Sequence, residues 1–117
     1  MLGVDIVSNE RIKRAVERFG ERFLKRVFTQ EELKYCKSQK AFYPCLSARW
    51  ACKEAVIKAL YQEFGVLLHL REVQVLGDVG KPARVKILRE GLEDIRVVVS
   101  LSHERDYSVA VALVSKL

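Results

Sequence analysis

The sequence has few of the residues from which zinc centres and disulfide frameworks are built. It contains three cysteines and two histidines in 117 residues, and no two cysteines stand in a C-x-x-C pair. This spacing excludes the common zinc sites. An odd number of unpaired cysteines also argues against a disulfide framework. We therefore expect Cys36, Cys45 and Cys52 to be free thiols in a reducing cytosol.

Long apolar runs are also missing. No stretch reaches the roughly 18 consecutive apolar residues that a membrane-spanning helix needs. Residues 1–7 include an aspartate and are too short for a signal peptide. We therefore expect a cytoplasmic protein that does not enter a membrane. With 50% hydrophobic and 31% charged residues and no linker or repeat, residues 1–117 are predicted to form a single domain.

The net charge of +6 favours an acidic partner, which includes nucleic acid, an anionic membrane, an acidic protein or a phosphate-rich ligand. Residues 11–26 hold seven basic residues against two acidic ones. This segment is either a solvated helix face or a surface for an acidic protein or for nucleic acid phosphates. Few aromatic residues lie between these cations, which weakens the nucleic-acid interpretation.

The apolar pattern predicts one strand, then helices, then further strands. We expect strands at residues 2–7, 72–76, 83–88, 95–101 and 107–114, and helices at residues 8–20, 21–27, 29–37 and 44–60. Residues 77–82 (Gly-Asp-Val-Gly-Lys-Pro) carry a strong turn signal. This order is typical of an α+β domain with helices packed on a small, mainly antiparallel sheet.

The predicted helix at 44–60 has two different sides. Small and apolar residues recur at steps of three and four and predict a buried stripe, which comprises Ala48, Ala51, Cys52, Ala55, Val56, Ala59 and Leu60. The other side is expected to carry Arg49, Trp50, Lys53, Glu54 and Lys58. Trp50, Glu54 and Lys58 follow each other at intervals of four, so they stack along one line. An ordinary solvated helix face has the same composition.

Two carboxylates stand out as candidates for chemistry. Asp5 lies in an otherwise apolar strand, where a charge is costly unless it is paired, coordinates a cation or reaches solvent at the strand end. Glu54 alone is most simply a solvated residue or a partner of Lys58. Together, two carboxylates without histidine or cysteine ligands suit Mg²⁺, which completes its coordination with waters and substrate phosphates.

Cations near these carboxylates suggest a phosphorylated ligand. Arg49, Lys53 and Lys58 share the helix of Glu54, and Lys81 and His103 are further candidates in loops. His103 follows a predicted strand, at a kind of position where functional residues concentrate, although a surface histidine is the simpler interpretation. These residues alone leave both interpretations open.

Two segments in the same order resemble the signature of the phosphopantetheinyl transferases. Residues 3–5 (Gly-Val-Asp) resemble its first motif, and residues 50–58 resemble its second, an aromatic residue followed by Lys-Glu-Ala and a further lysine. The short chain, and residues 100–103 (Ser-Leu-Ser-His) before an alanine-containing strand, resemble the holo-[acyl-carrier-protein] synthase branch. One departure is the segment 61–65, which stands where the family often has a Gly-x-Gly turn.

The resemblance implies the family's fold and a Mg²⁺-dependent reaction. The 4'-phosphopantetheine group of coenzyme A would pass to a serine of apo-acyl carrier protein in fatty acid biosynthesis, with release of adenosine 3',5'-bisphosphate. Asp5 and Glu54 match the metal ligands, Glu54 would help to deprotonate the serine, and Lys58 would meet the leaving phosphate. The branch is typically a homotrimer with sites at subunit interfaces. The alternatives are a transferase for a secondary-metabolism carrier protein and, in another class, a small basic RNA-binding domain.

The resemblance also implies two sets of binding residues. The coenzyme A contacts would be Arg49, Lys53, Lys58, Lys81, Pro82 and His103, of which Lys81 and Pro82 follow Gly80 in a turn near the adenine. The docking surface for acyl carrier protein would include Arg11, Arg14, Arg22 and Phe23 in the basic segment. Nucleic acid and membrane are not expected as partners.

Overall fold

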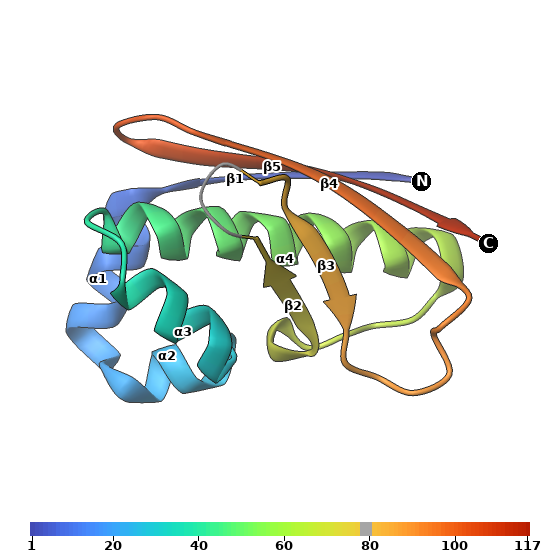
Figure 1. The fold of residues 1–117 in the computed structure, drawn as a ribbon, viewed down its shortest axis with the longest axis horizontal. Coiled ribbons are helices and arrows are strands. Elements are labelled where there is room, and N and C mark those ends of the chain that lie inside the picture. The colour runs from blue at the N-terminus through green and yellow to red at the C-terminus, as the bar shows by residue number, and fades with distance from the viewer. Residues whose placement is uncertain (78–80) are drawn as a thin grey trace.

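The computed structural model describes residues 1–77 and 81–117. In chain order the elements are β1 (Leu2–Ser8), α1 (Asn9–Phe19), α2 (Glu21–Val27), α3 (Gln30–Lys37), α4 (Phe42–Phe64), the 3-10 helix η1 (Leu70–Glu72), β2 (Val73–Leu76), β3 (Arg84–Ile87), β4 (Ile95–His103) and β5 (Tyr107–Lys116). The long helix α4 lies at the centre of this arrangement (Figure 1). Helices α1, α2 and α3 gather near its first residues, and both chain termini lie at the opposite end (Figure 1).

The strands form two separate sheets that pack around α4. The larger sheet has the order β1-β5-β4 and runs along the length of α4, while β2 and β3 form a two-stranded sheet (Figure 1). All three pairings are antiparallel, and they set Asp5 opposite Ala110 and His103 opposite Ser108. The prediction of an α+β fold with small antiparallel sheets is confirmed.

The three short helices lie where the sequence predicts them, and capping residues set three of their ends. The Ser8 hydroxyl accepts a hydrogen bond from the Arg11 amide at 3.1 Å, and Gly20 ends α1 with a φ of 57°. Thr29 and Glu32 form a capping box at the start of α3. The predicted helices at 8–20, 21–27 and 29–37 are therefore confirmed.

Helix α4 is longer than the prediction of residues 44–60. It starts two residues before Pro44, whose missing amide hydrogen is tolerated in a first turn. It ends at Gly65, whose φ of 69° suits a glycine and whose amide donates to the Tyr61 carbonyl at 2.9 Å. Residues 61–64, which depart from the family pattern, are thus helical. No helix within residues 1–77 and 81–117 is long and apolar enough to cross a membrane.

The strands of the second half lie where the sequence predicts them, with different ends. Strands β4 and β5 extend to His103 and Lys116 because each residue finds a partner on the neighbouring strand. Glu72 belongs to η1 and not to β2. The predicted turn at 77–82, with Gly80, includes residues 78–80, which lie outside the described residues.

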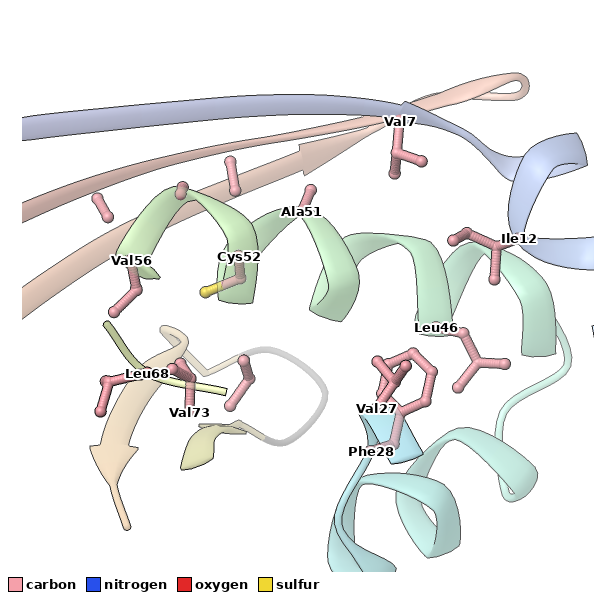
Figure 2. Packing of buried hydrophobic residues seen from close by; sticks show 14 of the residues in the cluster. Val7, Ile12, Val27, Phe28, Leu46, Ala51, Cys52, Val56, Leu68 and Val73 are labelled. Atoms are coloured by element: carbon pink, nitrogen blue, oxygen red, sulfur yellow. The ribbon is translucent and has the colours of Figure 1, made fainter. Parts of the chain in front are cut away.

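The core is built on the small residues of α4. All seven residues of the predicted stripe are buried. Figure 2 shows Ala51 facing the sheet near Val7, while Val56 and Cys52 point towards Leu68 and Val73 on the other side. Small side chains on the sheet side allow α4 to approach the strands closely, which fixes the distance between α4 and β1.

Gly3 is the point of closest approach between β1 and α4. A methyl group at Gly3 would lie 2.0 Å from the Ala55 carbonyl oxygen and 3.0 Å from the Ala59 methyl group. We expect Gly3→Ala to lower the free energy of unfolding by about 3 kcal/mol, because β1 must shift away from the helix. Urea unfolding measures this loss. Gly77→Ala is the matched control, since among the described residues its new methyl group meets nothing closer than 3.4 Å.

The expectation of three free thiols is wrong for two of them. Cys36 and Cys45 form a disulfide, with their Cα atoms 5.5 Å apart. It joins the last turn of α3 to the first turn of α4. The sequence conceals this pairing because the approach of the two helix ends depends on the chain reversal between them. Cys52 is free and buried, and burial raises the pKa of its thiol to about 12.

Candidate functional site

One group of predicted site residues meets between β1 and α4. The Lys58 amine donates to an Asp5 carboxylate oxygen at 2.8 Å and to the Val4 carbonyl at 3.0 Å. Glu54 lies one turn before Lys58 on α4, and Arg11 reaches the same region from α1. Gly3 and Asp5 lie two residues apart and therefore share the strand face that the close contact at Gly3 holds against α4.

Glu54 is half-buried and shares its surroundings with a second carboxylate. Burial raises the pKa of Glu54, the charge of Asp5 raises it further, and Lys58 and Arg11 oppose the rise. Two carboxylates that disfavour each other's charge are stabilised by a cation between them. Within the described residues no group of three or more histidine, cysteine or acidic residues could hold a metal. Two hard oxygen ligands nevertheless fit Mg²⁺, which takes few protein ligands.

A second group of predicted residues borders a cavity of about 730 Å³ between α4, β4 and the β2–β3 sheet. Arg49, Lys81, Pro82 and His103 all line it. Helix α3 and the segment that follows it supply further lining residues that the sequence interpretation missed: Tyr35 from α3, and Gln39 and Lys40 from the segment. Lys40 could have been proposed as a phosphate-binding cation because it lies in a loop, but it is outside both sequence motifs.

Arg49 is a buried cation at the wall of this cavity. Its side chain is 7% exposed, and within the described residues its Nε atom has no hydrogen-bond partner. A guanidinium nitrogen donates to the Cys45 sulfur at 3.4 Å, and the guanidinium carbon lies 4.4 Å from the centre of the Tyr35 ring. Burial lowers the pKa of Arg49, while Glu32 and Tyr35 oppose this. An anionic ligand in the cavity would supply the partner that a buried guanidinium requires.

Lys53 does not lie on an exposed face of α4, as the sequence interpretation placed it. Its side chain is 0% exposed, and its amine lies 2.7 Å from a carboxylate oxygen of the equally buried Glu32. The amine also donates to the carbonyls of Leu70 and Val73. The amine is thus surrounded by protein acceptors and does not line the cavity, so we remove Lys53 from the expected coenzyme A contacts.

The two groups of site residues lie at different edges of the large sheet. Asp5, Glu54 and Lys58 belong to the β1 edge, and none of them lines the cavity, which lies at the β4 edge. The sequence interpretation placed both groups around one ligand. Within one chain the structure brings each group together but keeps the two apart.

The predicted docking residues lie on α1 and α2. They are next to Asp5, Glu54 and Lys58, which we call the β1-edge group. The Phe23 ring stacks on Trp50 with ring centres 6.0 Å apart, and the Arg11 guanidinium lies 5.8 Å from the Trp50 ring. Arg14 pairs with Glu10 at 3.3 Å, and Arg22 is exposed. This basic surface therefore leads directly to the α4 turn that carries Glu54.

The family model of the 4'-phosphopantetheinyl transferase superfamily matches residues 1–112. The chain belongs to this superfamily. Within it, the chain is 58% identical to the holo-[acyl-carrier-protein] synthase of Aquifex aeolicus, over 99% of this chain and 98% of that protein. The corresponding synthase of Leptospira biflexa is 45% identical, over 98% of this chain and 95% of that protein.

Solved structures agree with these sequence relatives. Holo-[acyl-carrier-protein] synthase from Helicobacter pylori, in complex with coenzyme A, superposes with a TM-score of 0.83 at 29% identity and covers 98% of this chain and 100% of its own. The synthase from Neisseria meningitidis gives a TM-score of 0.85 at 31% identity, with 98% and 97% covered. The fold and the branch suggested by the sequence motifs are both found in these relatives.

Proposed function

We propose that this protein transfers the 4'-phosphopantetheine group of coenzyme A to a serine of apo-acyl carrier protein, as a holo-[acyl-carrier-protein] synthase in fatty acid biosynthesis. The observation that carries the proposal is the meeting of Asp5, Glu54 and Lys58 between β1 and α4. The coenzyme A bound by the Helicobacter pylori relative supports the choice of donor. The cytoplasm is the proposed place of action, and residues 1–117 form the one proposed catalytic domain.

The β1-edge group can perform the chemistry of the transfer. A Mg²⁺ ion held by Asp5 and Glu54 would supply Lewis-acid neutralisation of the pyrophosphate charge. The Lys58 ammonium, fixed by the Val4 carbonyl, stabilises the negative charge that grows on the departing phosphate. Glu54 is the group placed to accept the proton of the carrier serine, which is the role of a general base.

The cavity at the β4 edge suits the nucleotide part of coenzyme A. Arg49, Lys81 and His103 provide cations or hydrogen-bond donors for phosphate groups, and Pro82 provides an apolar surface for the adenine. The lack of a partner for the Arg49 Nε atom among the described residues supports an anion beside it. Lys58 lies outside the cavity, so its proposed contact is with the pyrophosphate end of the ligand.

A homotrimer would join the two groups of site residues. They lie at opposite edges of the sheet in one chain. In the trimer, Asp5, Glu54 and Lys58 of one subunit would lie beside the cavity of its neighbour. The outer face of the sheet is also apolar and exposed. It comprises Leu2, Val4, Ile6, Val98, Val111 and Leu113, which are 41% to 63% exposed. An apolar face of this kind marks an interface between subunits.

Val111 lies in the middle strand of this outer face, opposite Val4. We expect Val111→Asp to convert the assembly into monomers and to abolish transfer, because a buried unpaired charge at the interface is costly. Sedimentation equilibrium measures the mass, with Gln62→Asp, exposed on α4, as the control. A variant that keeps the mass of the parent protein would contradict this placement of the interface.

The basic surface of α1 and α2 suits an acidic carrier protein. We expect Arg14→Glu to raise the KM for the carrier by about fivefold, because an exposed attraction between Arg14 and an acidic residue of the carrier becomes a repulsion. The affinity for coenzyme A should stay unchanged, because Arg14 lies outside the cavity. Steady-state kinetics with each substrate varied in turn measures both effects. Lys86→Glu, at an exposed lysine on β3, is the control. If Arg14→Glu weakened coenzyme A binding as much as carrier binding, the assignment of this surface would be wrong.

The direct test is the intact mass of apo-acyl carrier protein after incubation with this protein, coenzyme A and Mg²⁺. A mass increase equal to one phosphopantetheine group supports the proposal. Comparison of rates on fatty-acid and secondary-metabolism carriers distinguishes the two transferase alternatives. Salt-sensitive oligonucleotide binding without any coenzyme A turnover would instead identify an RNA-binding domain.

A further inference from the structure

We propose that the Cys36–Cys45 disulfide is a positioning bond for the cofactor cavity, so that thiol–disulfide exchange sets the affinity for coenzyme A. The inference rests on the proposed function, since it takes coenzyme A to be the ligand of the cavity. It assigns a role to two cysteines that neither the family motifs nor the proposed chemistry uses.

The disulfide closes the segment that forms one wall of the cavity. Residues 38–41 connect α3 to α4, and Cys36 and Cys45 stand on either side of this connection. Gln39, Lys40 and Ala41 line the cavity, and Cys45 itself lines it as well. Other hydrogen bonds hold each end of the segment to its own helix. On the α3 side the Ser38 hydroxyl donates to the Tyr35 carbonyl at 2.6 Å and the Gln39 amide donates to the Cys36 carbonyl at 3.1 Å, while on the α4 side the Cys45 amide donates to the Ala41 carbonyl at 3.0 Å. None of these bonds joins the two sides, as the disulfide does.

The bond also contacts the buried cation of the cavity. The Arg49 guanidinium donates to the Cys45 sulfur at 3.4 Å from one turn further along α4. The Tyr35 ring beneath the same guanidinium belongs to α3, the other helix that the disulfide holds. The disulfide therefore holds in place two groups that contact the Arg49 guanidinium, the Cys45 sulfur and the Tyr35 ring.

Exchange with a dithiol reductant can open this bond. One thiolate of the dithiol attacks the sulfur of Cys45, which is partly exposed, whereas Cys36 is fully buried. Cys36 leaves as a thiolate and takes up a proton. The second thiol then attacks the mixed disulfide, releasing Cys45 as a thiolate that Arg49 stabilises until it is protonated. The products are two cysteine thiols and the oxidised, cyclic form of the dithiol.

The oxidised form should bind coenzyme A more tightly. Without the bond, Lys40, Gln39 and the contacts of Arg49 must be ordered when the ligand binds. Ordering one or two side chains weakens binding by roughly three- to tenfold. The hydrogen bonds, ion pairs and ring contacts described above for the β1-edge group and the carrier surface involve none of residues 38–41. We therefore expect kcat at saturating coenzyme A and the KM for the carrier to stay unchanged.

The test is calorimetric titration of coenzyme A into the full chain in its oxidised form, after reduction with dithiothreitol, and after reoxidation. We expect three- to tenfold weaker binding on reduction and full recovery on reoxidation. Cys45→Ala should bind as weakly as the reduced protein under both conditions, whereas the control Cys52→Ser should respond to the dithiol as the parent protein does. Thermal unfolding checks that each sample is folded at the temperature of the titration.

Equal coenzyme A affinities of the oxidised and reduced forms would overturn this inference alone. A Cys45→Ala variant that binds as tightly as the oxidised protein would overturn it as well. Absence of coenzyme A binding in every form would instead overturn the proposed function, and this inference with it.

Discussion

Glu54→Gln is expected to lose at least about a thousandfold in the rate of phosphopantetheine transfer while its fold stays intact. The substitution removes both the proposed general base and one of two proposed metal ligands, and a positioned acid or base alone contributes about 10² to 10⁴ in rate. Burial, and after it the neighbouring charge of Asp5, disfavours the ionised form of Glu54 and raises its pKa. A neutral amide at this position should therefore leave the free energy of unfolding unchanged or raise it.

Intact-mass assays of the carrier protein measure the rate, and urea unfolding measures the stability. Glu90→Gln is the matched control, because Glu90 is exposed and lies in neither group of site residues. Asp5→Asn should show a similar loss, since Asp5 is the other proposed ligand. Unchanged activity of Glu54→Gln would contradict the catalytic assignment, and full activity of the parent protein in EDTA would contradict the metal assignment.

Lys53→Met is expected to lower the free energy of unfolding by about 3–5 kcal/mol, because it leaves the Glu32 carboxylate buried without its cation. Burial lowers the pKa of Lys53, and the adjacent Glu32 opposes this shift. Glu32 also accepts hydrogen bonds from the Thr29 and Val75 amides, each at 2.8 Å, so its position depends on α3 and β2. The effect of Lys53→Met should be on stability, not on a ligand contact.

Urea unfolding of the single and double variants measures this effect. The double variant Glu32→Gln with Lys53→Met should recover more than half of the lost stability, because no unpaired charge remains buried. Lys86→Met, an exposed lysine on β3, should change stability by less than about 0.5 kcal/mol. A loss below about 1 kcal/mol for Lys53→Met would contradict the buried pair.

Local signals predicted the helices well because their causes are local. Ser8, Gly20 and the Thr29 capping box fix their helix ends through neighbours within four residues. The buried stripe of α4 follows from its helical period. Helical periodicity placed Lys53 and Glu54 on the same exposed side of α4, although Lys53 is fully buried and Glu54 is only half-buried. The decisive partner of Lys53, Glu32, lies on another helix.

The candidate site was predictable by motif but not by arrangement. The meeting of Asp5, Glu54 and Lys58 followed from two motifs of the family signature, and the structure brings these residues together. The separation of this group from the cavity depends on the strand order β1-β5-β4, which the sequence does not state. The disulfide likewise depends on how α3 meets α4 in space, so counting cysteines gave the wrong expectation.

Strand β1 divides two tasks between its alternate residues. Gly3, Asp5 and Val7 face α4, while Leu2, Val4 and Ile6 form part of the exposed apolar face. This division depends on the register of β1 on β5, because a slip by one residue would turn every β1 side chain to the opposite face. An insertion between Gly3 and Asp5 would reverse the facing of the residues on one side of it, so Gly3 and Asp5 could no longer both face α4. The length of this segment is therefore as constrained as its composition.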